Sequence, residues 1–334
     1  MAASMNGCVG VLVRGHGEEP TLAPEQRPIG RAALQLADDG IDVVFGDEVR
    51  DGRLWGFRAV PGGWSLAEGV PLLAVHDRFA SQTYPGHFQR ILEQTSKVPF
   101  GNPLALTQLC RDKVETQRWL GERGVAMPAI ETDPSLFGAT LERWGVAFAK
   151  PRYGALGKGV RQVSRGDSVA THVVGAVDGV LEPVFLQRAI APPAGWAGVS
   201  LRLLTQRTTS GDWLIVSWIM RRSREDPVVN VARGAEVSDA RQHLTPVVLR
   251  QVQARALAVA EVLSTHPASE SLVELGIDLV LDLDDTPHLI EVNSRPRGRL
   301  EVLASTSPEQ YADAHAEACA RPIRRLWALY GPTN

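Results

Sequence analysis

The sequence predicts an α/β protein of two or three lobes, and three observations support this fold class. With 334 residues the chain is too long for one simple hydrophobic core. The first hundred residues alternate short apolar strands with helix-like stretches, whereas strands dominate the pattern from 145 to 235. The hydrophobic fraction of 44% and the charged fraction of 22% are those of a soluble globular protein.

The N-terminal region is expected to form a small α/β lobe, because its elements follow strand–helix–strand order. An amphipathic helix is expected at 28–40, ending at a glycine, and a hairpin near 52–66. The expected strands are CVGVLV (8–13), IDVVFGD (41–47) and LLAVHDR (72–78). Asn102-Pro103 then breaks the chain, and a single helix is expected over Leu106–Arg123, stopped by Gly124 with Pro128 just beyond.

The remainder is expected to be mainly strands, with a helix at about 245–264 and a final helix in the tail that breaks at Pro322. A hairpin-like turn, TTSGD, joins the last two strands before residue 235. The expected strands here are VAFAKP, GVRQVS, PVFLQRAI, SLRLLTQ and WLIVSWIMRR.

Composition excludes several classes of function. A net charge of −3 gives no general electrostatic reason to bind nucleic acid or an anionic membrane. No apolar stretch approaches ~20 residues, and the N-terminus lacks the pattern of a signal peptide. The three cysteines, Cys8, Cys110 and Cys319, are far apart and are expected to be reduced thiols of a cytoplasmic protein. The histidines form no zinc motif, and the G-x-S-x-G element of many hydrolases is absent.

The segment 276–296, GIDLVLDLDDTPHLIEVNSRP, is the most informative stretch. Two strands joined by its acidic turn would bring Asp278, Glu291 and Asn293 near one another. Alternation along a strand places Glu291 and Asn293 on the same face. Hard oxygen ligands of this kind suit Mg²⁺ carrying substrate phosphates. An ordinary hairpin with polar ends is the alternative.

Lysine use gives a second clue, since only four of the 35 basic residues are lysines: Lys97, Lys113, Lys150 and Lys158. In a chain that otherwise uses arginine, a lysine indicates a need for a compact ammonium group, although biased codon use would have the same effect. Lys150 precedes a loop in which Gly154, Gly157 and Gly159 let backbone N–H groups approach an anion. This loop is not a P-loop, because the spacing differs and a strand follows it. It is expected to fold over a triphosphate; a flexible glycine turn is the alternative.

Taken in order, these motifs resemble the ATP-grasp superfamily of carboxylate–amine ligases, and within it the YheC/YheD-type, spore-coat-associated branch. The resemblance covers residues 72–300 and is weaker over the first 70. Its features are VHDRF (75–79), Asn102, the Lys113 helix with Leu120, Gly124 and Pro128, Lys150-Pro151, Gln187–Ile190, SLRLLTQ with GDW and Arg221, Asn230, Gly234, ELGIDLVLD (274–282) and LIEVNSRP.

The resemblance implies an ATP-grasp fold, with an N-terminal α/β lobe and two α+β subdomains that enclose an ATP cleft. The expected domains are an N-terminal domain at 1–104, an ATP-grasp domain at 105–305 and a helical tail at 306–334. Within the ATP-grasp domain, a small lobe spans about 125–190 and a C-terminal lobe about 191–305.

The resemblance also implies roles for individual residues. Two Mg²⁺ ions, for which Mn²⁺ can substitute, would be held by Asp278, Glu291 and Asn293. The transferring phosphoryl group would be stabilised by Arg202 and Arg221. ATP would be bound by the two lysines on its phosphates, by the glycine loop, and by backbone groups at its adenine edge; these residues are Lys113, Lys150, Gly154, Gly157, Lys158, Gly159, Gln187, Arg188, Ala189 and Ile190.

Alternatives remain for the less specific positions. Arg221 and Arg222 are neighbours on an expected strand, so only one can face the cleft, and Arg221 is favoured. Arg202 is alternatively a structural ion-pair partner. Asn230 and Gly234 would shape a substrate loop or form an ordinary turn. Arg295, with Arg297 and Arg299, would bind a substrate carboxylate or form a solvated basic edge.

The sequence departs from D-alanine ligases at one position. Those relatives carry an arginine two residues before the metal aspartate, where this chain has Gly276. The charge is therefore expected to come from Arg202 or Arg221.

The activity implied is ATP-dependent ligation of a carboxylate to an amine through an acyl-phosphate, with release of ADP and phosphate. The expected partners are a small-molecule or peptide carboxylate and an amine co-substrate, without nucleic acid or membrane; a homo-oligomer is compatible with the sequence. Two alternatives are an ATP-binding coat or scaffold protein without ligase activity and an ATP-grasp kinase that phosphorylates a hydroxyl.

Overall fold

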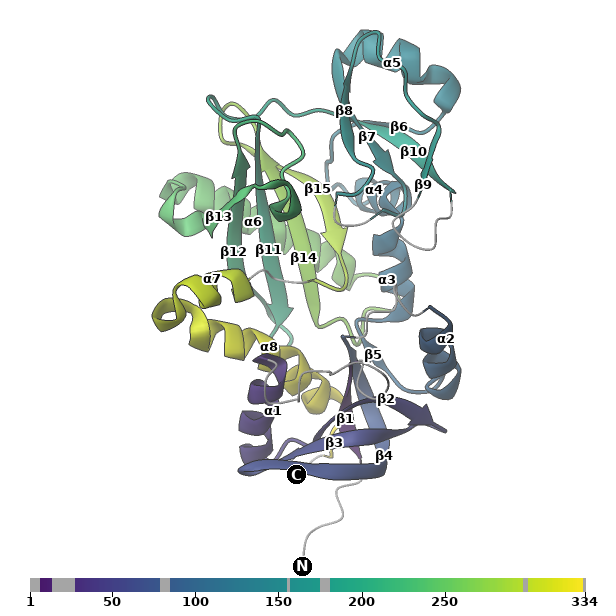
Figure 1. Cartoon of the computed structure of the whole chain (residues 1–334), viewed down its shortest axis with the longest axis vertical. Helices are drawn as coiled ribbons and strands as arrows, with labels where there is room; N and C mark the ends of the chain where they lie inside the picture. Colours follow the sequence, from purple (N-terminus) through teal and green to yellow (C-terminus); the bar gives the residue numbers. More distant parts are fainter. Residues whose placement is uncertain are drawn as a thin grey trace, which may run out of the picture.

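The structure, a computed structural model, describes residues 7–13, 28–78, 85–154, 157–174, 181–296 and 300–332. Three β-sheets organise this part of the chain. Figure 1 shows the N-terminal lobe at the bottom, the largest sheet above it, and a smaller lobe at the upper right. Arg297 and Arg299, and residues 155–156 of the glycine loop, lie outside the described residues.

The N-terminal lobe confirms the expected α/β pattern. It contains β1 (Cys8–Leu12), α1 (Pro28–Asp38), β2 (Val43–Arg50), β3 (Arg53–Val60), β4 (Gly63–Asp77), α2 (Pro85–Gln94) and β5 (Phe100–Gly101). Strand β1 pairs in parallel with both β2 and β4, and β3 joins β2 to β4 by antiparallel pairing. The expected hairpin is therefore the β3–β4 pair. Strand β4 is long enough to continue past it and lie beside β1.

The expected single helix over Leu106–Arg123 is wrong, because two helices occupy this segment: α3 (Leu104–Arg111) and α4 (Lys113–Gly121). Asp112 lies between them in an extended conformation, with φ −88° and ψ 98°. Its carboxylate accepts a hydrogen bond from the Glu115 N–H (3.1 Å) and so caps the second helix. The break places Lys113 at the first position of α4.

The small lobe is a second sheet, in which the strands expected from VAFAKP, GVRQVS and PVFLQRAI are confirmed. Its elements are β6 (Ile130–Glu131), η2 (Pro134–Leu136), α5 (Phe137–Trp144), β7 (Val146–Pro151), β8 (Arg161–Ser164), β9 (His172–Val174) and β10 (Leu181–Arg188). Strand β10 pairs with β6, β7 and β9, and β7 also pairs with β8. The glycine loop therefore connects two paired strands, β7 and β8.

The largest sheet has the strand order β13-β12-β11-β14-β15 and is antiparallel throughout. Its elements are β11 (Gly198–Arg207), β12 (Trp213–Ser223), η3 (Val231–Arg233), β13 (Glu236–Asp239), η4 (Ala240–Gln242), α6 (Pro246–Ser264), β14 (Glu274–Leu281) and β15 (Pro287–Asn293). Leu201, Leu203, Ile277 and Leu279 are fully buried in one core with the apolar side of α6. Alternation therefore turns the residues between them to the opposite face.

Two C-terminal helices complete the chain, α7 (Leu300–Thr306) and α8 (Pro308–Tyr330). The expected break at Pro322 is wrong, since α8 continues through it. Proline cannot donate a hydrogen bond to the carbonyl one turn earlier, that of Ala318. Here the Gln206 side-chain amide donates to this carbonyl instead (2.7 Å). No helix in the described ranges is both long and apolar enough to cross a membrane.

Candidate active site

Asp278 of β14 lies on the face of the largest sheet opposite α6. Arg202 is its neighbour on β11, and both oxygens of the carboxylate accept hydrogen bonds from the Arg202 guanidinium, with 2.6 Å from Nε to Oδ1. Arg221 of β12 donates to Oδ1 from Nη2 (2.9 Å). The Asp278 side chain is only 5% exposed. Three strands thus bring two arginines onto one carboxylate.

The charges in this cluster depend on one another. Burial alone would raise the pKa of Asp278, but the guanidinium groups of Arg202 and Arg221 outweigh it and hold that pKa below its ordinary value. Burial lowers the pKa of Arg221, against the attraction of Asp278. The carboxylate of Glu291, the strand partner of Asp278, balances the second arginine, so these four groups together are neutral. Lys150 of the small lobe adds the positive charge that favours an anion at this face of the sheet.

The structure places Arg221 and Arg222 on opposite sides, as alternation predicts. Whereas Arg221 contacts Asp278, the Arg222 guanidinium lies 4.8 Å from the centre of the Trp196 ring and pairs with Glu236 at 3.4 Å. Only Arg221 belongs to the cluster.

Glu291 and Asn293 lie beside Asp278 on β15. Glu291 is the strand partner of Asp278, and Asn293 Nδ2 donates to Asp278 Oδ2 (3.0 Å). Within the described part of the chain, the half-buried Glu291 carboxylate has no hydrogen bond or ion pair. The hairpin thus gathers the three oxygen-bearing side chains that the sequence singles out.

Gly276 makes room for one of the arginines. A Cβ at this position would lie 3.5 Å from Arg202 Nη1 and 2.9 Å from Pro296 Cβ. A long side chain at 276 would therefore compete with Arg202 for the same space. The Arg202 guanidinium thus occupies the space beside Gly276.

Lys150 faces this cluster from the small lobe. Its ammonium donates to Gln187 Oε1 (2.5 Å), and Gln187 in turn donates to Gln117 of α4 (3.4 Å). Burial lowers the pKa of Lys150 to about 8, with attraction from Glu291 acting against it. The sequence suggested only backbone roles for the Gln187 strand. The structure adds a side-chain role, because Gln187 holds the lysine.

The glycine loop is held from two sides. Lys113 Nζ donates to the carbonyl of Gly154. A Cβ at Gly154 would lie 2.9 Å from Pro151 Cβ, so the chain can pass here only without a side chain. Gly157 and Gly159 have φ of +69° and +70°, a region that favours glycine. Lys158 between them is exposed.

The segment after β10 leaves a backbone donor open. The N–H groups of Arg188 and Ala189 donate to the carbonyls of Ala129 (2.9 Å) and Val146 (3.3 Å). The next N–H, that of Ile190, makes no such bond within the described part of the chain. A planar base with an acceptor at its edge can pair with this group.

The loop between β12 and β13 contacts the glycine loop. A Cβ at Gly157 would lie 3.0 Å from Asn230 Nδ2, and Arg233 Nη2 donates to the carbonyl of Val160 (3.2 Å). Gly234, with φ +83°, closes a turn onto the Val231 carbonyl. Asn230 therefore lies where the two loops meet, whereas Gly234 has the geometry of an ordinary turn.

Arg295 points away from this junction. Its Nη2 lies 2.5 Å from Asp77 Oδ2 at the end of β4, and its guanidinium stacks on Phe88 of α2 at 4.9 Å. The structure thus places Arg295 between the N-terminal lobe and the largest sheet, rather than on a solvated edge.

Three comparisons bear on this arrangement. Residues 194–318 match the model of a family described as YheC/D like ATP-grasp. This segment contains the two arginines and the whole hairpin of Asp278, Glu291 and Asn293. The solved structures that the chain resembles share its fold over nearly its full length. The chain has the ATP-grasp fold.

The similar structures are distant in sequence. D-alanyl-alanine synthetase A from Vibrio cholerae has 14% identity and a TM-score of 0.56, covering 96% of this chain and 99% of its own. VanG D-Ala:D-Ser ligase from Enterococcus faecalis has 12% identity and a TM-score of 0.59, and the match covers 97% of this chain and 99% of that ligase. L-amino acid ligase from Bacillus licheniformis has 18% identity and a TM-score of 0.55, and the match covers 95% of this chain and 75% of that ligase. No curated protein sequence matches the chain significantly.

The residues present fit ATP and Mg²⁺, the cofactors that ATP-grasp enzymes use. Two side-chain carboxylates and an amide are the hard oxygen donors that Mg²⁺ prefers. The Glu291 carboxylate is unpaired within the described ranges, and the Arg221 Nε and Ser200 Oγ atoms there are buried without a hydrogen-bond partner. These groups would receive a metal ion and phosphate oxygens without loss of existing bonds. The Asp278 carboxylate would have to release part of its arginine contacts.

Proposed function

We propose that this protein, which has the ATP-grasp fold, is an ATP-dependent carboxylate–amine ligase. One observation carries the proposal: the hairpin of Asp278, Glu291 and Asn293 shares one face of the largest sheet with Arg202 and Arg221, and Lys150 of the small lobe lies near it. The carboxylates of Glu291 and Asp278 on the largest sheet attract Lys150 of the small lobe, and Lys113 of α4 repels it. Phosphate groups between these lysines and the two arginines would be surrounded by positive charge.

The proposed reaction has two steps. A carboxylate oxygen of the first substrate attacks the γ-phosphorus of ATP, and the bond to the β-phosphate oxygen breaks, which gives an acyl-phosphate and ADP. The amine of the second substrate then attacks the acyl carbon, phosphate leaves, and the nitrogen loses a proton to give the amide. Bound Mg²⁺ would supply positive charge for the phosphate oxygens.

The residues of the chain have positioning and electrostatic roles in this proposal. Lys113 of α4 and Lys150 of the small lobe would hold the ATP phosphates from two sides, and Asp278, Glu291 and Asn293 would hold the metal ions. Arg202 and Arg221 would stabilise the phosphoryl group as its negative charge spreads over three oxygens. No side chain needs to act as a nucleophile.

Amino acids are the proposed substrates, since the similar proteins include a D-alanyl-alanine synthetase, a D-Ala:D-Ser ligase and an L-amino acid ligase. The test incubates the protein with ATP, Mg²⁺ and pairs of amino acids, and measures ADP, phosphate and product mass. We expect ADP release that requires both substrates, together with free phosphate and an amide. A phosphorylated product would favour a kinase, and no ADP with any pair would favour a scaffold protein.

Arg221 and Arg222 provide a matched pair of variants for this assay. Arg221→Gln should lower kcat by about 100-fold, as loss of one preorganised donor to a transition-state oxygen typically does. Arg222→Gln should stay near wild type, because Arg222 lies on the other face of the sheet. Equal effects of the two substitutions would contradict the proposed role of the cluster.

A further inference from the structure

The two lysines of the proposed phosphate site come from separate elements and repel each other. Lys113 is the first residue of α4, and Lys150 lies near the end of β7. The charge of Lys113 contributes to the lowered pKa of Lys150, after burial and against attraction from Glu291. Without a ligand between them, this repulsion favours separation of the helix from the strand. A contact that joins the start of α4 to the end of β7 would oppose this separation.

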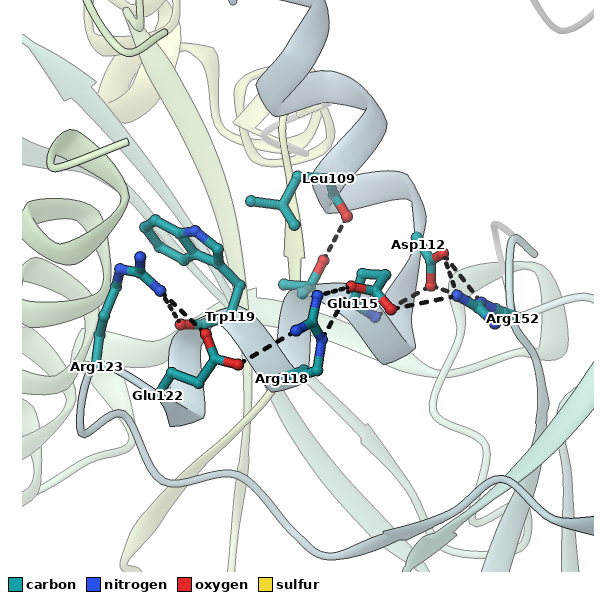
Figure 2. A network of polar contacts seen from close by, with 9 residues as sticks. Leu109, Asp112, Glu115, Arg118, Trp119, Glu122, Arg123 and Arg152 are labelled. Carbon is teal, nitrogen blue, oxygen red and sulfur yellow. Dashed lines mark hydrogen bonds and ion pairs between the residues drawn. The ribbon is translucent and has the colours of Figure 1, made fainter. Parts of the chain in front are cut away.

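An ion pair between Asp112 and Arg152, drawn in Figure 2, provides such a contact. Asp112 immediately precedes Lys113, and Arg152 follows Lys150 by two residues. The Arg152 guanidinium makes a bidentate contact with the Asp112 carboxylate: Nε donates to Oδ1 at 2.8 Å, and Nη2 donates to Oδ2 at 2.7 Å. Two parallel hydrogen bonds of this kind fix orientation as well as distance.

Backbone hydrogen bonds also connect the start of α4 to the end of β7. The Lys113 N–H donates to the carbonyl of Arg152 (3.2 Å), and the Arg152 N–H donates to Pro183 of β10 (2.9 Å). The Asp112 carboxylate also caps α4, so one side chain both starts the helix and binds the strand end. Movement of either partner would therefore move a lysine.

The pair differs from the rest of the polar network in Figure 2. Arg118 joins Glu115 and Glu122 along the surface of α4, and its side chain is 63% exposed. Exposed pairs within one helix contribute little stability. The Asp112 side chain is only 13% exposed, and its partner belongs to a different lobe. Burial works against its charge, yet Arg152 and the Glu115 N–H hold the pKa of Asp112 below its ordinary value.

We infer that Asp112 and Arg152 are positioning residues that set the spacing of Lys113 and Lys150 for the phosphates of ATP. This inference rests on the proposed function. The pair acts through the lysines rather than by contact with the nucleotide. Arg152 also neutralises the Asp112 carboxylate, which would otherwise repel a phosphate at the start of α4. A carboxylate that only capped α4 would need no arginine partner. The presence of Arg152 therefore distinguishes a positioning role of Asp112 from simple helix capping.

The test measures the dissociation constant of ATP with Mg²⁺ by calorimetry in the full-length protein. Asp112→Asn keeps a good capping residue but removes the charge. This variant and Arg152→Gln should each weaken ATP binding by about tenfold, the effect of losing a charged hydrogen bond worth ~1.4 kcal/mol. The double variant should be no weaker than either single variant, because both remove the same contact. Arg118→Gln, from the exposed part of the network, should bind ATP like wild type.

The unfolding midpoint without nucleotide separates positioning from general stability. Variants that unfold at lower temperature but bind ATP with wild-type affinity would overturn the inference, and so would fully additive effects in the double variant. If the wild type binds ATP and both single variants bind it with the same affinity, the inference about Asp112 and Arg152 is wrong, while the proposed function stands. If the wild type binds no ATP, the proposed function fails, and the inference fails with it.

Discussion

At the scale of single residues, Lys150 shows how burial adjusts a functional group. The Lys150 ammonium loses hydration because of burial, which lowers its pKa to about 8. Gln187 Oε1 accepts from this ammonium but carries no full charge to restore the pKa. A lysine with this pKa is charged at neutral pH and loses its proton at mildly alkaline pH.

ATP affinity should therefore depend on pH. In the proposed function, phosphates would bind the charged form of Lys150, so affinity should be highest below pH 8 and fall as the pH rises above it. The fall should approach tenfold per pH unit, and binding near pH 8 should take up protons, since each unit of pKa is ~1.4 kcal/mol. Calorimetry in buffers of different ionisation enthalpy measures both quantities. Lys150→Arg remains charged and should lack this dependence; an identical pH profile in that variant would contradict the assignment.

The sequence predicts some of these residues and not others. Alternation along β12 favours Arg221 over Arg222, and the i, i+2 rule places Glu291 with Asn293. Both rules act within one strand, and the structure has this geometry. The contacts of Arg152 with Asp112 and of Lys150 with Gln187 join elements far apart in sequence. No local pattern contains that information.

At the scale of elements, local rules fail where tertiary contacts satisfy the backbone. Asp112 ends one helix and caps the next, a role that its position three residues before Glu115 could have indicated. Pro322 is the opposite case, in which the local rule predicts a break that does not occur. The Ala318 carbonyl that proline leaves free accepts from a fully buried glutamine on the neighbouring sheet. The helix continues because Gln206 replaces the missing donor.

Substitution of that glutamine should destabilise the fold. Gln206→Met would leave the Ala318 carbonyl unpaired and remove a donor from buried Glu274, lowering the free energy of unfolding by about 1–3 kcal/mol. Urea denaturation measures this change. Adding Pro322→Ala restores a backbone N–H to the same carbonyl and should recover part of the loss. If this second substitution gives no recovery, the proposed replacement of the donor is wrong.

At the scale of the whole molecule, Asn102 joins the N-terminal lobe to the largest sheet. Its Nδ2 donates to the carbonyls of Glu274 (2.6 Å) and Ser294, and its Oδ1 accepts from the N–H groups of Val273 (2.8 Å) and Glu274 (3.1 Å). Glu274 begins β14, and Ser294 follows β15. One buried side chain thus fixes the ends of the two strands that carry Asp278 and Asn293.

Asn102→Ala should therefore lower the free energy of unfolding by at least about 3 kcal/mol, because several buried backbone groups lose their partners. Asn102→Asp is the matched control, since its carboxylate still accepts from both N–H groups but cannot donate to the carbonyls. We expect it to retain part of the stability. Chemical denaturation of the three proteins checks this order, and equal stability of Asn102→Ala and wild type would refute it.

The path of the last helix has a consequence for how the protein is made. Ile323 and Leu326 of α8 are fully buried in the same core as Val9 and Val11 of β1. A ribosome releases β1 first, so the first lobe emerges with part of its interior still unsynthesised. At typical translation rates the delay is on the order of tens of seconds, during which that apolar surface is open to chaperones or to misassociation. The lobe that begins the chain is therefore completed among the last parts of the molecule.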